Sequence, residues 1–165
     1  MSFSLIPKFL FRNLTDIPPD FLVSLGIKFL MVDLDNTVAA YNEHSVSDLA
    51  LKWFESVRNH DIDLFIISNS TRTDRVEAFA KELGTGFVMN ARKPSPSGLR
   101  KAMGMANYST DVSALAGDQI FTDTIAAGRA GVVSIIVRPK RFTNPFLALR
   151  YYIEFPFRLL CKNKK

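Results

Sequence analysis

Short apolar runs alternate with stretches of helical periodicity between residues 27 and 137. This alternation is typical of parallel strands that are joined by crossover helices. Each run is almost continuously apolar, as expected for a strand that is buried on both faces of a sheet. The runs predict five strands, at residues 27–33, 62–68, 86–89, 112–118 and 132–137.

The segments between these strands repeat apolar residues every three or four positions, as helices with one buried face do. They predict one helix with a stripe over residues 46–57, one over 76–83, one that starts at Ser95-Pro96 and one over 123–130. The first stripe consists of Val46, Leu49, Trp53, Phe54 and Val57. The fold class is therefore predicted to be α/β, with a doubly wound, mostly parallel five-stranded sheet and helices on both faces.

Polar residues at the strand ends are the first candidates for chemistry, because ligands of doubly wound sheets bind outside the carboxyl ends of the strands. Three carboxylates, a hydroxyl and an ammonium are expected to meet there. The strand ends carry Asp33 with Asp35, Ser68 with Asn69, Asn90 with the nearby Lys93, and Asp118.

Four short motifs at these positions carry a resemblance to a known family. The segments 33-DLDNT-37, 68-SNS-70, 93-KP-94 and 117-GDQIFTD-123 occur in the order of the four motifs of the haloacid dehalogenase-like (HAD) superfamily of phosphatases. Leu5-Ile6-Pro7 and Gly26-Ile27-Lys28 add a resemblance to the YqeG family of HAD subfamily IIIA, which is related to the mitochondrial phosphatidylglycerophosphatases. This narrower resemblance fades after Pro139.

The resemblance implies a Mg²⁺-dependent phosphomonoester hydrolase that works through an aspartyl-phosphate. Asp33 is then the nucleophile, and Asp35 protonates the leaving alkoxide and later deprotonates water. An anionic nucleophile attacking an anionic ester needs nearby cations, which Mg²⁺ and Lys93 supply.

The same resemblance assigns the metal and phosphate ligands. Mg²⁺ takes oxygen ligands and keeps several waters, so few protein ligands are enough. The implied set is Asp33, the backbone carbonyl of Asp35, Asp118 and, through a metal-bound water, Asp123. The Ser68 hydroxyl and the amides of Asn69 and Ser70 are expected to hold phosphate at a helix N-terminus.

Each candidate also has a simpler structural interpretation. The acid pair could be a capping turn, Ser68 and Asp123 could be helix caps, Lys93 a solvated loop residue and Asp118 a strand end. A response-regulator receiver uses similar residues, but there the lysine follows the last acid. Here Lys93 precedes Asp118, and the third strand ends in Asn90 rather than Asp.

Charge is distributed unevenly along the 165 residues. Residues 1–137 hold 13 Lys and Arg against 15 Asp and Glu, whereas residues 138–165 hold 8 against 1. We therefore expect a capless phosphatase domain at 1–139, which includes the N-terminal segment, and a basic, aromatic tail at 140–165. Residues 38–62 and 71–92 are too short for a cap domain, so the site should be open to a phosphate that projects from a large substrate.

The tail is predicted to form a helix that starts at Asn144-Pro145 and ends before Pro156. Apolar residues would cover most of its sides except the one with Arg150 and Glu154. Such a helix, beside basic residues, suits peripheral contact with an anionic membrane through residues 144–165. The alternative is packing on its own domain or on a partner in a homo-oligomer. Nucleic acid is not expected as a partner, because no known module accompanies the charge.

The single Cys161 cannot form an intrachain disulfide, and no apolar run is long enough to cross a membrane. The expected location is cytoplasmic, with peripheral attachment to the inner face of the membrane suggested by the tail. Phosphatidylglycerophosphate is the leading substrate. The alternatives are a small soluble ester such as a sugar phosphate and a non-enzymatic binding module on the same fold.

Overall fold

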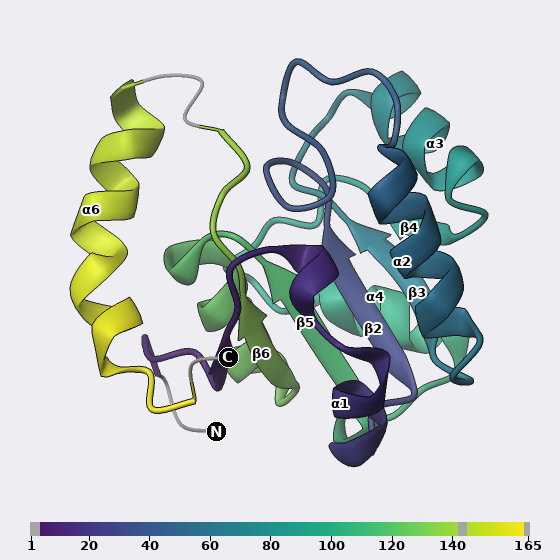
Figure 1. The fold of residues 1–165 in the computed structure, drawn as a ribbon, viewed down its shortest axis with the longest axis horizontal. Coiled ribbons are helices and arrows are strands. Elements are labelled where there is room, and N and C mark those ends of the chain that lie inside the picture. Colours follow the sequence, from purple (N-terminus) through teal and green to yellow (C-terminus); the bar gives the residue numbers. More distant parts are fainter. Residues whose placement is uncertain (1–3, 142–144, 164–165) are drawn as a thin grey trace.

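The computed structural model describes residues 4–141 and 145–163. One sheet of six parallel strands runs through it in the order β1-β6-β5-β2-β3-β4 (Figure 1). The strands are β1 (Phe9–Leu10), β2 (Phe29–Asp33), β3 (Asp63–Ile67), β4 (Gly86–Val88), β5 (Ser113–Gly117) and β6 (Val133–Ile136). The α-helices are α1 (Pro19–Ser24), α2 (Asp48–Arg58), α3 (Thr73–Glu82), α4 (Ser97–Ala106), α5 (Ile125–Ala130) and α6 (Pro145–Leu160).

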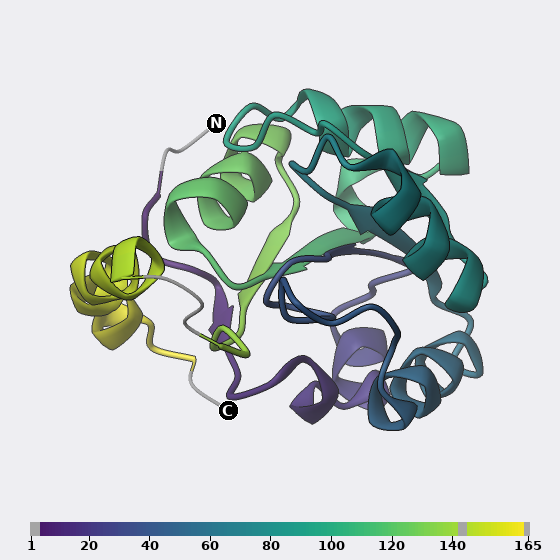
Figure 2. The same ribbon diagram turned by 90° about the horizontal axis from the view of Figure 1, so that it is seen from above.

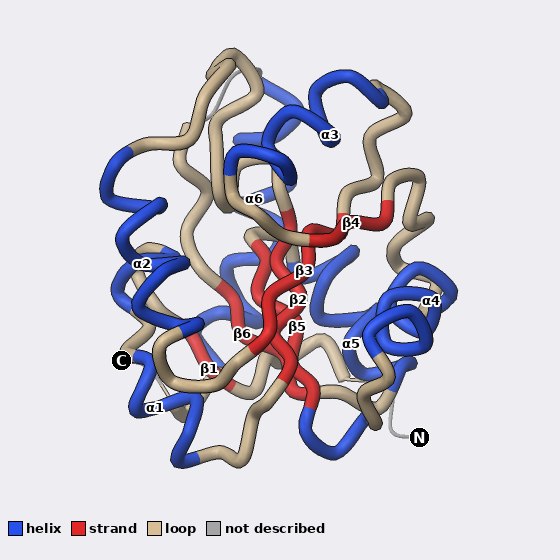
Figure 3. Tube along the Cα trace, turned by 90° about the vertical axis from the view of Figure 1, so that its right-hand side faces the viewer, coloured by secondary structure: helices blue, strands red, loops and turns tan. Residues whose placement is uncertain are grey.

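Helices cover both faces of the sheet, so the molecule has three layers (Figure 3). Alternate residues of the central strand β2 point to opposite faces. Leu30 and Val32 join the core beneath α1, α2 and α3, whereas Phe29 and Met31 join the core beneath α4 and α5. All five β2 residues are buried. The doubly wound α/β fold class predicted from the sequence is confirmed, and residues 38–62 and 71–92 hold no cap domain.

Several details of the predicted elements are wrong. The sheet has six strands, because Phe9–Leu10 pairs with β6; two residues are too few to show a periodicity. Leu49 is 65% exposed, since it lies on the outer side of α2. The third helix begins at Ser97, after a turn and bend over residues 93–96. The fourth is preceded by a π-helical turn, Ile120–Thr124.

Helix α6 lies outside the two helical layers, beyond the β1–β6 edge of the sheet (Figure 2). It continues through Pro156 to Leu160, which contradicts the predicted end. Proline removes a hydrogen bond to the carbonyl four residues earlier, and here that carbonyl belongs to the exposed Tyr152, where water can replace the bond. The predicted start is only partly visible, because Asn144 lies outside the described residues.

The two sides of α6 are reversed relative to an ordinary surface helix. Its charged side faces the domain, with Glu154 1% and Arg158 3% exposed. Its apolar side faces outward and exposes Phe146, Leu149, Tyr152, Ile153, Phe155, Leu159 and Leu160. The tail therefore packs on its own domain through charge and leaves an apolar surface uncovered by described residues. We call Arg150, Glu154 and Arg158 the α6 cluster.

Candidate active site

Three carboxylates meet at the carboxyl ends of the central strands. Asp33 ends β2, and Asp118 follows the end of the neighbouring β5. Asp123 comes from the π-helical turn, where its Oδ2 accepts a hydrogen bond from the Gln119 backbone at 3.0 Å. One carboxylate oxygen from each aspartate lies within 4.8 Å of the others, and all three residues are buried.

Gly117 makes the approach of Asp123 possible. A Cβ atom on Gly117 would lie 2.4 Å from the Asp123 carboxylate, far inside van der Waals contact. Its backbone φ is not in the left-handed region, so the glycine is required by space rather than by conformation. The Gly in the fourth motif is thereby tied to the position of a candidate metal ligand.

Lys93 joins the three carboxylates. Its Nζ lies 2.5 Å from Asp33 Oδ1 and 2.7 Å from Asp123 Oδ1, and it also donates to the Ile67 carbonyl at 3.3 Å. The side chain is 2% exposed, so Lys93 is not a solvated loop lysine. We call Asp33, Lys93, Asp118 and Asp123 the active-site cluster.

Asn69 fixes the loop that carries Lys93. Its amide nitrogen donates to the Lys93 carbonyl at 2.9 Å, and its oxygen accepts from the Lys93 N–H at 2.8 Å. These paired bonds join the end of β3 to the Lys93 loop. The Asn69 side chain therefore has a positioning role that the sequence does not reveal.

Burial and like charge shift the acidity of the site. Burial raises the pKa of Asp33 to about 7, with Asp123 adding to the rise and Lys93 opposing it. Burial, together with the charges of Asp33 and Asp123, raises the pKa of Asp118 well above its ordinary range. Burial alone would lower the pKa of Lys93, but Asp123 and Asp33 raise it above the ordinary value, so the ammonium stays charged.

The site fits a hard divalent cation. Three carboxylates face one ammonium, so the active-site cluster has an excess of negative charge when it is ionised. Asp118 Oδ1 is buried and has no hydrogen-bond partner among the described residues. A buried carboxylate oxygen without a partner is costly unless it ligates an ion. Mg²⁺ prefers oxygen ligands of this kind, so the predicted cofactor suits the residues present.

Asp35 lies beside the active-site cluster and is held by neighbours. Its side chain is 13% exposed, and it pairs with Arg75 Nε at 3.3 Å. The Ser68 hydroxyl lies 3.5 Å from its second oxygen. Arg75 also donates to the Ala40 and Glu43 carbonyls, so it fastens the loop after Asp35 to α3. Arg75 carries no sequence signal that distinguishes it from an exposed helical arginine.

The predicted phosphate ligands are placed differently from expectation. The Ser70 N–H donates to the Ser68 hydroxyl at 3.0 Å. Helix α3 begins at Thr73, three residues beyond Ser70, so these residues do not form a helix N-terminus. The reason is local: the Ser68 and Ser70 hydroxyls accept from backbone N–H groups two residues ahead and stabilise turns instead.

A cavity of about 210 Å³ opens onto the site. Its lining combines Asp33, Asp35, Asn69, Lys93 and Asp123 with Tyr41, Gln119, Thr122 and Arg150. Arg150 comes from α6, 27 residues beyond the last motif, where sequence spacing gives no indication of it. A larger hollow of about 570 Å³ contains none of the predicted site residues.

Fold and site together define a phosphatase of the HAD type, as the four motifs predict. Within that class, the chain belongs to the mitochondrial PGP phosphatase family, whose sequence model matches residues 2–140. It is 28% identical over 160 residues to the probable phosphatase YqeG of Bacillus subtilis (strain 168). This match covers 97% of this chain and 92% of that protein.

Solved structures share the fold at lower identity. A putative 3-deoxy-D-manno-octulosonate 8-phosphate phosphatase from Vibrio cholerae matches with a TM-score of 0.57 and 17% identity, over 78% of this chain and 75% of that one. The 3-deoxy-D-manno-octulosonate 8-phosphate phosphatase from Moraxella catarrhalis, in complex with a magnesium ion, a phosphate ion and a KDO molecule, matches with a TM-score of 0.52 and 15% identity, over 84% of this chain and 91% of that one. Both support the architecture.

Proposed function

We propose that this phosphatase is Mg²⁺-dependent and hydrolyses its ester through an aspartyl-phosphate on Asp33. The observation that carries the proposal is the active-site cluster: three buried carboxylates and one buried ammonium at the end of the central strand. The Asp33 side chain combines burial with a directly bonded lysine, which suits a nucleophile that must meet an anionic phosphate.

The roles proposed for the other residues follow from their positions. Lys93 neutralises charge between Asp33 and the incoming phosphate, and Asp35 transfers the proton to the leaving oxygen and from water. Asp33, Asp118, Asp123 and the Asp35 carbonyl would hold Mg²⁺, which when bound offsets the charge of the phosphate oxygens. Asn69 lines the cavity and its side chain holds Lys93 in place, and the Ser68 hydroxyl and the Ser70 amide remain proposed phosphate ligands beside it.

Phosphatidylglycerophosphate is the substrate we propose. The name of the family, mitochondrial PGP phosphatase, supports this substrate. The absence of a cap in residues 38–62 and 71–92 suits a phosphate that projects from a surface. A small soluble sugar phosphate is the second candidate, because the two structural relatives carry the names of sugar-acid phosphate phosphatases.

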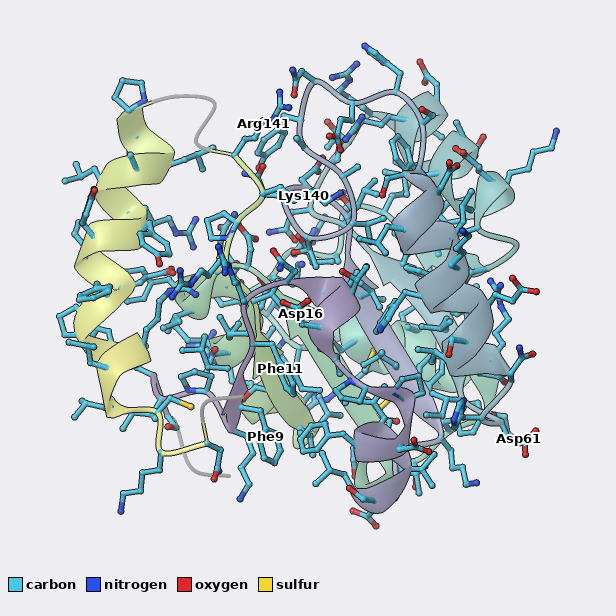
Figure 4. All side chains as sticks on the ribbon, in the orientation of Figure 1. Phe9, Phe11, Asp16, Asp61, Lys140 and Arg141 are labelled. Atoms are coloured by element: carbon cyan, nitrogen blue, oxygen red, sulfur yellow. The ribbon has the colours of Figure 1, made fainter. Side chains whose placement is uncertain are left out.

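The outer side of α6 supports docking on an anionic lipid surface. Leu149, Tyr152 and Ile153 are 58%, 71% and 54% exposed. Exposed Lys140 and Arg141 precede the helix, and Figure 4 labels both on the segment that comes before α6 in the chain. Among the described residues, no helix is long and apolar enough to span a bilayer. Contact at the interface is therefore the mode that these residues favour.

The test is a Mg²⁺-dependent phosphate-release assay. It compares phosphatidylglycerophosphate in micelles, a sugar phosphate and an aryl phosphate, with Asp33→Asn as the blank. We expect the lipid to be preferred, and a wild type that releases phosphate from none of them would overturn the proposal. A vesicle-sedimentation assay checks docking: Tyr152→Ser with Ile153→Ser should weaken binding to anionic vesicles. Met105→Ser, an equally exposed apolar site on α4, should not.

A further inference from the structure

Arg150 is a cation of the α6 cluster that also lines the active-site cavity. Its side chain is 23% exposed, whereas that of Lys93 is 2% exposed and is held by Asp33 and Asp123. Lys93 and Arg150 are the cationic residues among the described residues that line this cavity. Arg150 is therefore the one with more access to solvent and to a second group of a bound substrate.

The guanidinium is held from one side and presented on the other. Arg150 Nε donates to Glu154 Oε1 at 3.4 Å, and the guanidinium carbon lies 6.0 Å from the centre of the Phe121 ring. The structure records no hydrogen bond from its terminal nitrogens to any described residue. An arginine uses these two nitrogens to bind phosphate or carboxylate in bidentate fashion.

Glu154 keeps Arg150 at the cavity rather than free in solvent. The carboxylate is buried and also accepts from the Phe121 N–H at 3.0 Å, in the turn between Asp118 and Asp123. Arg158 pairs with the second Glu154 oxygen at 3.6 Å and donates to the Asp118 carbonyl. The α6 cluster thus ties Arg150 to the loop that carries two of the candidate metal ligands.

We propose that Arg150 is a specificity-determining residue, which binds a second anionic group on the substrate while the phosphate monoester reacts at Asp33. This inference rests on the proposed phosphatase function and narrows the substrates to phosphate monoesters that carry a second anionic group elsewhere in the molecule. Two kinds of substrate could supply this second anionic group: a phospholipid headgroup, through its phosphodiester, and a sugar-acid phosphate, through its carboxylate.

Four soluble esters separate these sources from membrane binding. Short-chain phosphatidylglycerophosphate below its micelle concentration carries the phosphodiester without a surface, and 6-phosphogluconate carries a carboxylate. Glucose 6-phosphate and p-nitrophenyl phosphate lack a second anion. For each second-anion ester, the kcat/KM is divided by the kcat/KM for glucose 6-phosphate. Arg150→Gln should lower this ratio about tenfold for at least one of the two second-anion esters, mainly through KM, since a hydrogen bond to a charged group has roughly this effect.

Arg150→Lys should restore part of that ratio, because it keeps the charge but loses the bidentate geometry. Arg100→Gln, an exposed arginine on α4, is the matched control and should leave the ratio unchanged. An unaltered ratio for both second-anion esters in Arg150→Gln would overturn the inference, even though turnover itself supported the phosphatase.

Calorimetry gives an independent readout if turnover fails. The same esters are titrated into Asp33→Asn protein with Mg²⁺, with and without Arg150→Gln. We expect about tenfold weaker binding of the second-anion ester alone. Equal weakening of all four esters would indicate a general structural role for Arg150 and overturn the inference, whereas a wild type without turnover contradicts the proposed function separately.

Discussion

The active-site cluster and the α6 cluster both bury charged side chains, but they balance charge in different ways. In the α6 cluster Glu154 lies between two guanidiniums, and both of its oxygens have partners. In the active-site cluster three carboxylates share one ammonium, and Asp118 Oδ1 has no partner among the described residues. A buried carboxylate whose charge is compensated, such as Glu154, serves packing, whereas buried carboxylates in excess over their cations are suited to bind a metal ion.

Asp33→Asn should have the largest effect on the active-site cluster. The amide keeps the shape but removes the proposed nucleophile, so turnover should fall by at least about 10³-fold. Rapid-quench trapping with a radiolabelled aryl phosphate, whose leaving group needs little protonation, checks it: wild type and Asp35→Asn should both form an acid-stable phosphoenzyme, and Asp33→Asn should form none. A phosphoenzyme in Asp33→Asn would place the nucleophile elsewhere.

Arg158→Met tests the balanced cluster. It leaves Glu154 with less cationic compensation and removes a donor to the Asp118 and Val137 carbonyls, so the free energy of unfolding should fall by about 3 kcal/mol. Urea denaturation at fixed Mg²⁺ measures it. The double variant with Glu154→Met should lose less than the sum of the two single losses. Additive losses would show that the two side chains do not act as a pair.

Gly117→Ala tests the geometry of the active-site cluster without changing its charge. The new Cβ would collide with the Asp123 carboxylate, so Asp123 must shift and Mg²⁺ should bind roughly 30-fold more weakly. Calorimetric titration of Mg²⁺ measures the change. Gly104→Ala is the control, because a Cβ there meets nothing within 4 Å and should stabilise α4 slightly. Unchanged Mg²⁺ affinity in Gly117→Ala would remove Asp123 from the metal site.

The two clusters also differ in how far the sequence could predict them. Asp33 and Asp118 follow continuous apolar runs, so the parallel sheet places them together without any knowledge of side-chain contacts. Glu154 and Arg158 lie on a short amphipathic pattern, for which the charged side is normally expected to face solvent. Their burial depends on polar groups beside the β1–β6 edge of the sheet, and the strand that completes this edge, β1, has only two residues.

Local hydrogen bonding limited the prediction in a similar way. The sequence places Ser68 and Asn69 correctly at a strand end, but it cannot show that Asn69 pairs with the Lys93 backbone. Nor can it show that the Ser68 and Ser70 hydroxyls form turns and delay the start of α3. These outcomes depend on competition between side-chain and backbone donors, which composition and spacing do not resolve.

The smallest expected effect is a pH dependence of stability that arises in the active-site cluster and not in the α6 cluster. Burial raises the pKa of Asp33 to about 7, from an ordinary value near 3.8. Between these values the folded state binds more protons at Asp33 than the unfolded state does, so this residue lowers the stability of the metal-free protein as pH rises. The contribution should be about 1 kcal/mol between pH 6 and pH 7.

Thermal melts of wild type and Asp33→Asn in EDTA measure that contribution as the difference between their pH profiles. Asp33→Asn should gain stability relative to wild type as pH rises. Because Mg²⁺ competes with protons for these carboxylates, excess Mg²⁺ should raise the wild-type Tm more at pH 8 than at pH 5. Arg158→Met should shift the curve downward without changing this dependence on Mg²⁺. A dependence that vanished in Arg158→Met would mean that α6 and the metal loop act as one charged unit, and the distinction between balanced and unbalanced clusters would fail.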